Sequence, residues 1–153
     1  MTFHIFNKKE KQDILKALKE QFGITTLFGT LIKRGTERIF LFQGSLNEKQ
    51  ITKLEETVPI ERVGVYFAKI QGADIRLSIE GVQLLKDQIT KNVFEINELQ
   101  MQEWMSGNEL PIKTGKHCFL IMKHKNDFLG TGKASEEKIT NFISKSRRLK
   151  NRG

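Results

Sequence analysis

The sequence predicts an α+β fold in which a mixed, largely antiparallel sheet with helices is followed by a small β-barrel. In residues 1–89, four β-rich runs are interspersed with three segments of helical spacing, a pattern typical of helices packed on such a sheet. In residues 90–153, several short strands and a single helix favour a small barrel. No linker-like composition separates the two parts, so we expect two closely abutted domains with these bounds.

The composition suits a folded, soluble chain. Its 153 residues are 38% hydrophobic and include 11 Phe, which is enough to build a core. No apolar run approaches the roughly 18 to 20 residues that span a bilayer, and the N-terminus lacks a secretory signal pattern, so we expect a cytoplasmic protein without membrane contact. The single Cys118 excludes an internal disulfide and, in its apolar run, is expected to be buried.

The first unit is predicted to begin with a capped helix and a hairpin. Asn7 is a suitable N-cap for a helix over residues 8–22, where apolar residues recur at helical spacing, and Gly23 is a suitable stop. Two β-rich runs follow, at residues 24–33 and 37–42. The glycine between these runs favours a tight turn, so they are expected to pair as a hairpin.

A second helix and a second strand pair complete this unit. Asn47, with a Gln three residues later, predicts a capping box for a short helix that ends no later than Pro59. Residues 62–70 and 74–79 are expected to pair as strands. Because the first of these runs is apolar on both faces, it is predicted to be a central strand. A helical turn is then expected to close the unit near Ile89.

The second unit is predicted to contain a strand, a helix, a hairpin and a last strand. The first strand covers residues 92–96, and Asn97 caps a helix over residues 98–106, again with a Gln at the third following position. A hairpin over residues 118–133 turns at Lys125 and Asn126. Residues 139–143 supply the last strand before the basic tail.

The helix over residues 98–106 is expected to pack through Leu99, Trp104 and Met105. Trp104 has the chemistry of a base-stacking platform, but a lone Trp on an amphipathic helix more often belongs to the core. We therefore predict that Trp104 is buried.

Gly130 and Gly132 flank Thr131 inside the predicted hairpin, so they do not form a dinucleotide-binding turn, which requires a helix directly after the glycines. Two interpretations remain open for them. The glycines either form a β-bulge or tight barrel corner, or leave room for a nucleic acid backbone to approach the strand.

The formal charge of the chain lies entirely in its C-terminal segment. Residues 113–153 contain 11 Lys and Arg against 3 acids, a net of +8, and the first 112 residues contain 15 of each sign. This asymmetry is typical of a polyanion binder, although a solvated basic tail is the alternative. Binding is favoured because the cations extend back into strand-like segments. Lys150 and Arg152, at the terminus, are expected to add only screened, long-range attraction.

Motifs for catalysis are missing from the sequence. There is no P-loop, no G-x-S-x-G, no H-E-x-x-H and no paired Cys pattern, and the three His residues are not placed beside a nucleophile. We therefore expect no catalytic residues, no metal ligands and no cofactor. An enzyme with an unrecognised pocket is the alternative from another class, and a module that binds only proteins is a third.

Four segments together resemble a known family: NVFEI, the helix ending in WMSG, the strand FLGTGKAS, and KITNFISKSRRL. They resemble the PUA-like RNA-binding domain at the C-terminus of Sun-family RNA cytosine-5 methyltransferases, especially archaeal ones. The likeness covers about residues 60–150 because VGVYFAKI and DIRLSIEGVQLL are similar to the segment before that domain. The chain lacks the SAM-binding glycine motif and the Pro-Cys or Thr-Cys pair of those enzymes, so methyl transfer is not implied.

The order of elements over the whole chain is also similar to that of large-subunit biogenesis factors built from a pre-PUA and a PUA domain. The resemblance implies a pre-PUA-like domain at residues 1–89 and a PUA-like domain with a basic tail at residues 90–153. It implies a stand-alone, monomeric protein that binds structured rRNA or tRNA in RNA modification, rRNA processing or ribosome biogenesis. An accessory RNA-binding subunit of a separate RNA methyltransferase is the alternative, and a pre-ribosomal particle is a further expected partner.

Eight residues of the basic segment are the expected RNA contacts. Lys133 follows the glycine-spaced strand, where its ammonium is suited to a phosphate. Arg147 and Arg148 lie just beyond the last predicted strand, and guanidinium groups suit bidentate phosphate contacts or stacking on an unpaired base. The full set is Lys123, Lys125, Lys133, Lys138, Asn141, Lys145, Arg147 and Arg148.

Overall fold

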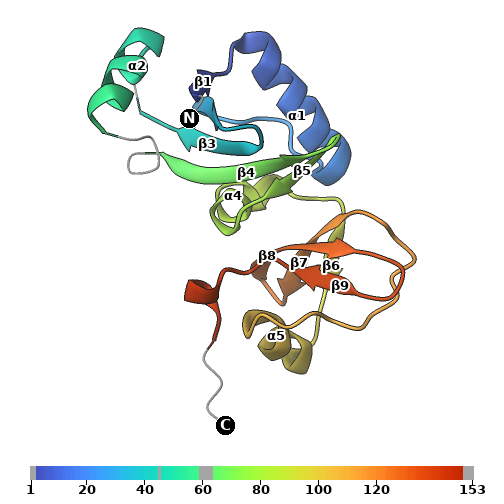
Figure 1. Ribbon diagram of the computed structural model, residues 1–153. Coiled ribbons are helices and arrows are strands. Elements are labelled where there is room, and N and C mark those ends of the chain that lie inside the picture. Colours follow the sequence, from blue (N-terminus) through green and yellow to red (C-terminus); the bar gives the residue numbers. More distant parts are fainter. Residues whose placement is uncertain (1–2, 45, 59–63, 150–153) are drawn as a thin grey trace.

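The computed structural model describes residues 3–44, 46–58 and 64–149, and shows two β-sheets with helices packed on them (Figure 1). The α+β class and the second, small barrel-like sheet predicted from the sequence are confirmed. The predicted helix stop at Pro59, the start of the strand at residues 62–63 and the terminal cations Lys150 and Arg152 lie outside the described residues.

The first sheet is an antiparallel meander in which strands follow their sequence order. Its strands are β1 (Phe3–Ile5), β2 (Thr30–Arg34), β3 (Arg38–Phe42), β4 (Val65–Gln71) and β5 (Asp74–Leu77). β4 lies between β3 and β5 and buries Phe67 and Ala68, as predicted for a central strand. The sequence analysis missed β1 because three residues are too few to show a period of two.

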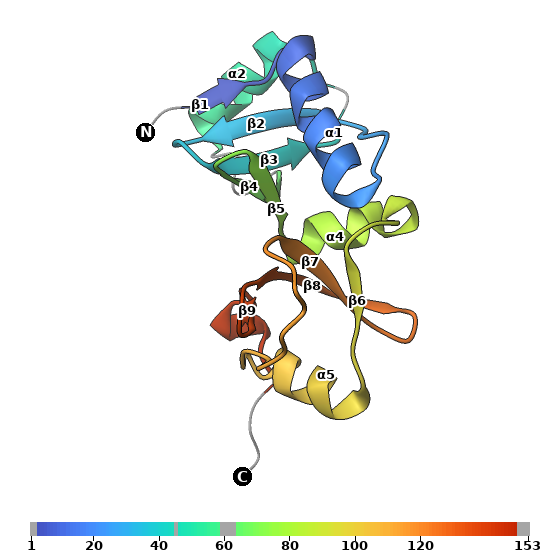
Figure 2. The same cartoon turned by 90° about the vertical axis from the view of Figure 1, so that its right-hand side faces the viewer.

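The second sheet lies below the first (Figure 2) and has the order β6-β7-β8-β9. β6 pairs with β7 in parallel and the other pairs are antiparallel, with bounds β6 (Val93–Glu95), β7 (Phe119–His124), β8 (Asp127–Ala134) and β9 (Ile139–Asn141). Trp104 is fully buried inside this sheet, as predicted, and its indole N–H donates to the Leu129 carbonyl at 2.9 Å. Cys118, predicted to be buried, is only partly buried beside this core.

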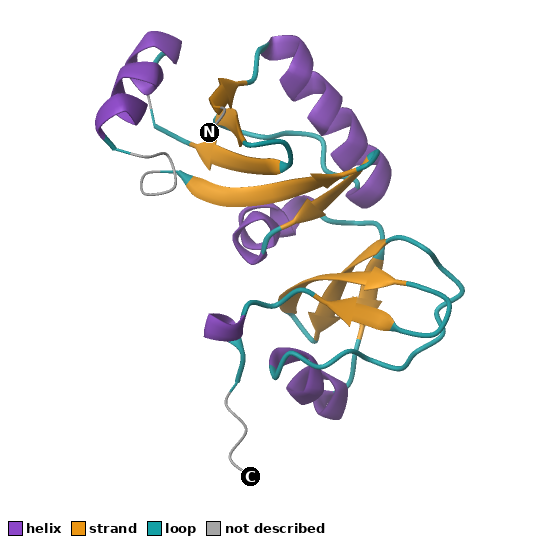
Figure 3. Ribbon diagram, in the orientation of Figure 1, coloured by secondary structure: helices purple, strands orange, loops and turns teal. Residues whose placement is uncertain are grey.

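The helices that follow Asn7, Asn47 and Asn97 begin where the sequence predicts (Figure 3), whereas the helix from Ile79 begins inside the strand predicted over residues 74–79. Asn7, Asn47 and Asn97 each accept the backbone N–H of the third following residue at 2.8 to 2.9 Å, in complete capping boxes. The helices are α1 (Lys8–Phe22), α2 (Glu48–Thr57), α4 (Ile79–Leu85) and α5 (Glu98–Met105), with short 3₁₀ turns η1 (Lys86–Gln88) and η2 (Lys145–Arg147). Within the described residues, none of them is long and apolar enough to cross a membrane.

Three predicted strands are longer than the observed ones. Residues 24–29 form a loop, whose Thr25 and Thr26 N–H groups donate to the side chain of Gln88 rather than to a strand. Ser78 ends β5 because its hydroxyl caps α4. Asn141 ends β9 because its side-chain oxygen accepts the Ile143 N–H at 2.7 Å. In each case a polar side chain competes with the sheet for backbone N–H groups.

The predicted packing face of α5 is wrong at Leu99, which is 74% exposed. Leu99 is five residues from Trp104, and at 3.6 residues per turn this places it about 140° around the helix. Met105, as predicted, and Met101, three residues before Trp104, pack against the hydrophobic core around Trp104.

The two glycines of β8 serve packing within the protein. A Cβ at Gly132 would lie 2.6 Å from Ile139 Cγ2 and 2.7 Å from Trp104 Cη2. Gly130 has φ +88° and lies where the register between β7 and β8 shifts. Both glycines are buried. Of the two interpretations left open by the sequence, the bulge and tight barrel corner therefore applies, and the approach of a nucleic acid backbone does not.

One hydrophobic core joins the two sheets. It contains Phe22 of α1, Phe67 of β4 and Val82 of α4 together with Phe119 and Ile121 of β7. α4 lies between the sheets, where it contacts both β4 and β8 (Figure 2).

Hydrogen bonds also join the same two parts, among them the Thr131 hydroxyl to the Leu77 carbonyl at 3.0 Å, the Gln83 amide to the Phe128 carbonyl, and the Asn92 amide to the Gln21 carbonyl. We propose that residues 1–89 and 90–153 are two structural units held rigidly by this core and these bonds.

We expect the whole chain to unfold in one transition because the core is shared. Ile121→Ala should lower the free energy of unfolding by about 2 to 5 kcal/mol, the usual cost of emptying a buried site. Leu99→Ala, on an exposed face, should change it by less than about 0.5 kcal/mol. Denaturant titrations followed by Trp104 fluorescence, which reports on the second sheet, and by far-ultraviolet circular dichroism check this. Midpoints that differ between the two probes would contradict a shared core.

Candidate functional site

The eight predicted contact residues fall into two groups at opposite ends of the second sheet. Lys123 and Lys125 lie at the turn between β7 and β8, whereas the other six lie around β9 and η2. Figure 2 shows this turn and β9 on opposite sides of the barrel. Lys133 lies opposite Phe119, and the four residue steps from Phe119 to Lys123 along β7 span about 13 Å at a rise of roughly 3.3 Å per residue. The structure therefore does not bring all eight residues into one site.

At the hairpin turn, the two lysines differ in their surroundings. The ammonium of Lys123 lies 5.6 Å from the centre of the Phe128 ring, a loose cation–π contact. Lys125 is exposed and holds φ +55° in the turn, where its backbone N–H donates to the Glu95 carboxylate at 3.0 Å. This carboxylate weakens the positive potential at the turn.

Lys133, at the other end, is positioned by an aromatic ring. Its ammonium lies 4.6 Å from the centre of the Phe119 ring, and Phe119 is the residue directly opposite in β7. Because Phe119 is only 2% exposed, its ring is a fixed support for the lysine side chain. The ammonium is thus held close to the sheet surface, where it is available to an anion.

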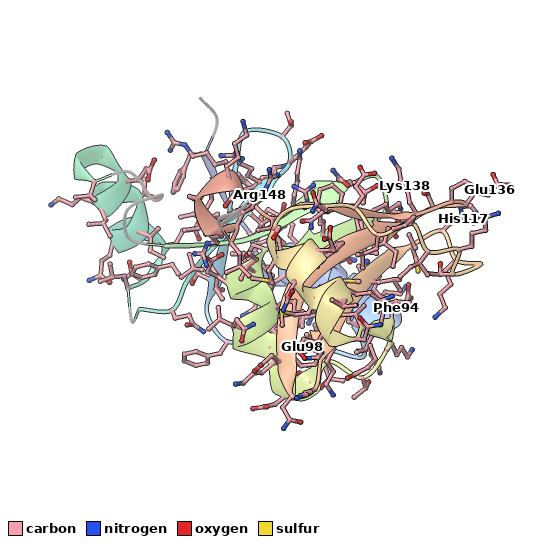
Figure 4. The ribbon with its side chains drawn as sticks, turned by 90° about the horizontal axis from the view of Figure 1, so that it is seen from below. Phe94, Glu98, His117, Glu136, Lys138 and Arg148 are labelled. Carbon is pink, nitrogen blue, oxygen red and sulfur yellow. The ribbon has the colours of Figure 1, made fainter. Side chains whose placement is uncertain are left out.

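Lys138 is neutralised by a neighbour. Its ammonium lies 2.7 Å from the Glu109 carboxylate, with both side chains about half exposed. In Figure 4, Lys138 lies towards Glu136 and His117 and away from Arg148. Lys138 is therefore separated from the other cations of its group.

The side chain of Asn141 has a structural role. Both hydrogens of its amide are used, because Nδ2 donates to the carbonyls of Trp104 at 2.7 Å and Asn108 at 3.0 Å. Its oxygen accepts the Ile143 N–H. These bonds attach β9 to the end of α5.

Arg148 also has a structural role. Its Nε donates to the Ile143 carbonyl at 2.9 Å, and its side chain lies over Gly107, where a Cβ would meet Arg148 Cδ at 2.4 Å. The next residue, Leu149, donates its N–H to the Met105 carbonyl at 2.7 Å. The end of the chain is thus fixed on α5, and the glycine that follows this helix provides the space.

The remaining two predicted contacts lie on η2. Arg147 is half exposed and forms an ion pair with Glu80 at the start of α4. Lys145 is exposed and has no ion pair with any residue in the described part of the chain. Arg147 thus lies against α4, whereas Lys133 lies over Phe119 of β7.

A pocket of about 450 Å³ lies next to η2, between the two sheets. The residues that line it include the aromatic Tyr66 and Phe142 and the cations Arg76 and Arg147. The Arg76 guanidinium stacks on the Phe142 ring at 4.2 Å from its centre.

The sequence analysis missed Arg76, Tyr66 and Phe142. The signal that was available is the aromatic Phe142 within the basic tail and a cation, Arg76, among the apolar residues of a strand.

We expect Gly107→Ala to detach the end of the chain. The added methyl displaces Arg148, so residues 145–149 should gain fast motion in backbone ¹⁵N relaxation. Gly115→Ala is the matched control, because Gly115 has a similar φ of +76° but nothing within 4 Å of the new Cβ. Both variants should suffer the backbone strain of about 1 to 2 kcal/mol. Unchanged relaxation in Gly107→Ala would contradict the anchoring role.

The segment from β6 to η2 matches a known family. Residues 91–149 match the family model described as the methyltransferase RsmF PUA domain. No curated protein matches the chain. PUA domains are RNA-binding rather than catalytic modules, so the match implies RNA binding. The part of the chain from residue 91 to residue 149 is a PUA-like domain of the type found in RsmF, a Sun-family RNA cytosine-5 methyltransferase.

Proposed function

We propose that this chain is a cytoplasmic, stand-alone protein that binds structured rRNA or tRNA in RNA modification or ribosome biogenesis. The observation that carries this proposal is the PUA-like domain at residues 91–149, which contains most of the basic segment that runs from residue 113 to residue 153. Residues 1–89 act as a pre-PUA-like domain that is packed rigidly against it. The protein acts as a monomer.

The contacts with RNA are led by phosphate groups. Lys133 and Lys145 have no carboxylate partner in the described part of the chain, and Arg147 is half exposed beside its ion pair. All three lie on β8 or η2, near the border with the first sheet. Lysine ammonium groups act as point charges on phosphate, so this group favours affinity over base selectivity. Lys123 and Lys125, at the far turn, form a secondary electrostatic contact.

The Asn141 amide and the Arg148 Nε are already hydrogen-bonded within the protein, so these groups support the surface and do not contact RNA. Their hydrogen bonds position β9 and η2, and thereby Lys145 and Arg147. Lys138, paired with Glu109, contributes little to the field at this surface.

The second candidate function is an accessory subunit that delivers RNA to a separate RNA methyltransferase. One observation favours it: the matched domain is that of a methyltransferase, whereas this chain has neither a SAM-binding glycine motif nor a catalytic Pro-Cys or Thr-Cys pair. Either role requires the same RNA-binding surface and no catalytic step in this chain. Co-purification of a methyltransferase with the tagged protein would favour the accessory role.

We expect the pair Lys133→Gln and Lys145→Gln to weaken binding to a tRNA or an rRNA hairpin severalfold. Loss of two phosphate contacts should also reduce the slope of log affinity against log salt concentration by roughly 1.8, at about 0.9 per contact with a duplex. Lys16→Gln with Lys19→Gln, two exposed positions on α1, removes the same charge as a control and should change affinity less than twofold. Fluorescence anisotropy at several salt concentrations measures both quantities. Equal losses in the two double variants would show that net charge alone, and no defined surface, attracts RNA.

A further inference from the structure

We propose that the pocket between the two sheets takes an unpaired nucleotide of the bound RNA. The base stacks against the aromatic and guanidinium surfaces of the pocket, and Arg76 contacts the adjacent phosphate. This inference rests on the proposed RNA-binding function and extends it to the first sheet, which lies outside the PUA-like domain.

The pocket has the size and the wall chemistry for a nucleotide. Its volume of about 450 Å³ lies within the roughly 300 to 1,000 Å³ usual for small-ligand sites. Its lining residues include the aromatic Tyr66 of β4 and Phe142 after β9, and Arg76 of β5 supplies a cation. Aromatic rings combined with arginine are the surfaces that proteins use to hold unstacked RNA bases.

Arg76 is held ready for this contact by a row of rings. Its guanidinium stacks on Phe142 at 4.2 Å, and Phe142 meets Phe119 edge to face with ring centres 6.3 Å apart. The ammonium of Lys133 also lies over the Phe119 ring, 4.6 Å from its centre. A guanidinium stacked on one ring still offers its other face to a base and its N–H groups, in the plane, to a phosphate. The row thus links Arg76 with Lys133, a predicted contact of the PUA-like domain.

The first sheet continues the positive surface away from the pocket. Arg38, Lys69 and Arg76 are direct cross-strand partners on β3, β4 and β5. Like charges directly opposite each other in a sheet are destabilising. Glu37 lies 3.3 Å from Lys69, whereas Arg38 and Arg76 have no carboxylate partner among the residues that the structure describes. A bound phosphate backbone would offset this repulsion.

Glu80 determines which anion the pocket suits. Its carboxylate lines the pocket and forms the ion pair with Arg147, so one acid and two arginines share the wall. A small free anion gains little there, because the carboxylate repels it. A nucleotide instead places its uncharged base inside the pocket and its phosphate at Arg76, further along the wall. The pocket therefore suits an RNA nucleotide better than inorganic phosphate.

The test compares two RNA hairpins of equal length, one fully paired and one with a single unpaired 2-aminopurine in its stem. The wild-type protein should bind the bulged hairpin more tightly and change the 2-aminopurine fluorescence, because the base enters a stacked environment. Arg76→Gln should weaken binding to the bulged hairpin about tenfold, within the range for loss of one stacking contact. Its affinity for the paired hairpin should fall less than threefold.

Two further variants sharpen the test. Arg76→Lys keeps the charge but loses the planar group, so it should also lose the preference for the bulge. Lys16→Gln, on α1, should leave both affinities unchanged. Circular dichroism confirms that each variant is folded.

Three outcomes would overturn the proposal. If the Arg76→Gln variant binds the bulged hairpin as tightly as the wild-type protein does, RNA does not use the pocket. Equal losses on both hairpins would make Arg76 a plain phosphate contact. Wild-type protein that shows no preference for the bulge would exclude a base site. In all three cases, weaker binding by the Lys133→Gln and Lys145→Gln double variant would still support the proposed RNA-binding function. If the wild-type protein binds neither hairpin, the proposed RNA-binding function is contradicted as well.

Discussion

The hydrophobic core that α4 and β7 share with the first sheet is the constraint on which the rest of the structure depends. Val82 on one side and Phe119 and Ile121 on the other belong to a single core with α1 and β4. Because this core fixes the sheets relative to each other, residues far apart in sequence form one wall of the pocket. Arg76 and Phe142, 66 positions apart, stack only because of it. A PUA-like domain on a flexible tether would have the basic tail but not the pocket.

The residues that identify the family and the residues available to RNA are largely different ones. A side chain at position 132 would collide with Trp104 and Ile139, so only glycine fits there. A side chain at position 107 would collide with Arg148 in the same way. Asn141 uses its whole amide to hold β9 on α5. Gly107, Gly132 and Asn141 therefore attach β8, β9 and η2 to the barrel. In the function proposed above they act on RNA indirectly, through the placement of Lys133, Lys145 and Arg147.

Local signals in the sequence predicted most elements, and non-local geometry accounts for what they missed. The three Asn caps were predictable because each satisfies N–H groups within three residues. The error at Leu99 came from counting apolar residues on a short helix without respecting the 3.6-residue period. Some of the eight predicted contacts, such as Arg148 and Lys138, are bound to backbone or carboxylate groups. The sequence could not distinguish these from Lys145, which has no ion pair among the described residues. The pocket could not be predicted from the sequence because residues of both sheets line it, and these come together only when the sheets pack.

The most direct measurement is a map of backbone amide chemical shifts in the ¹⁵N-labelled protein as the bulged RNA hairpin is added. If RNA lies across the border between the sheets, the largest changes will cluster at Arg76 in the first sheet and at Lys133 and residues 142–147 in the second. Changes confined to the Lys123 and Lys125 turn, or to α2, would contradict this account, and the absence of changes at saturating RNA would contradict RNA binding altogether.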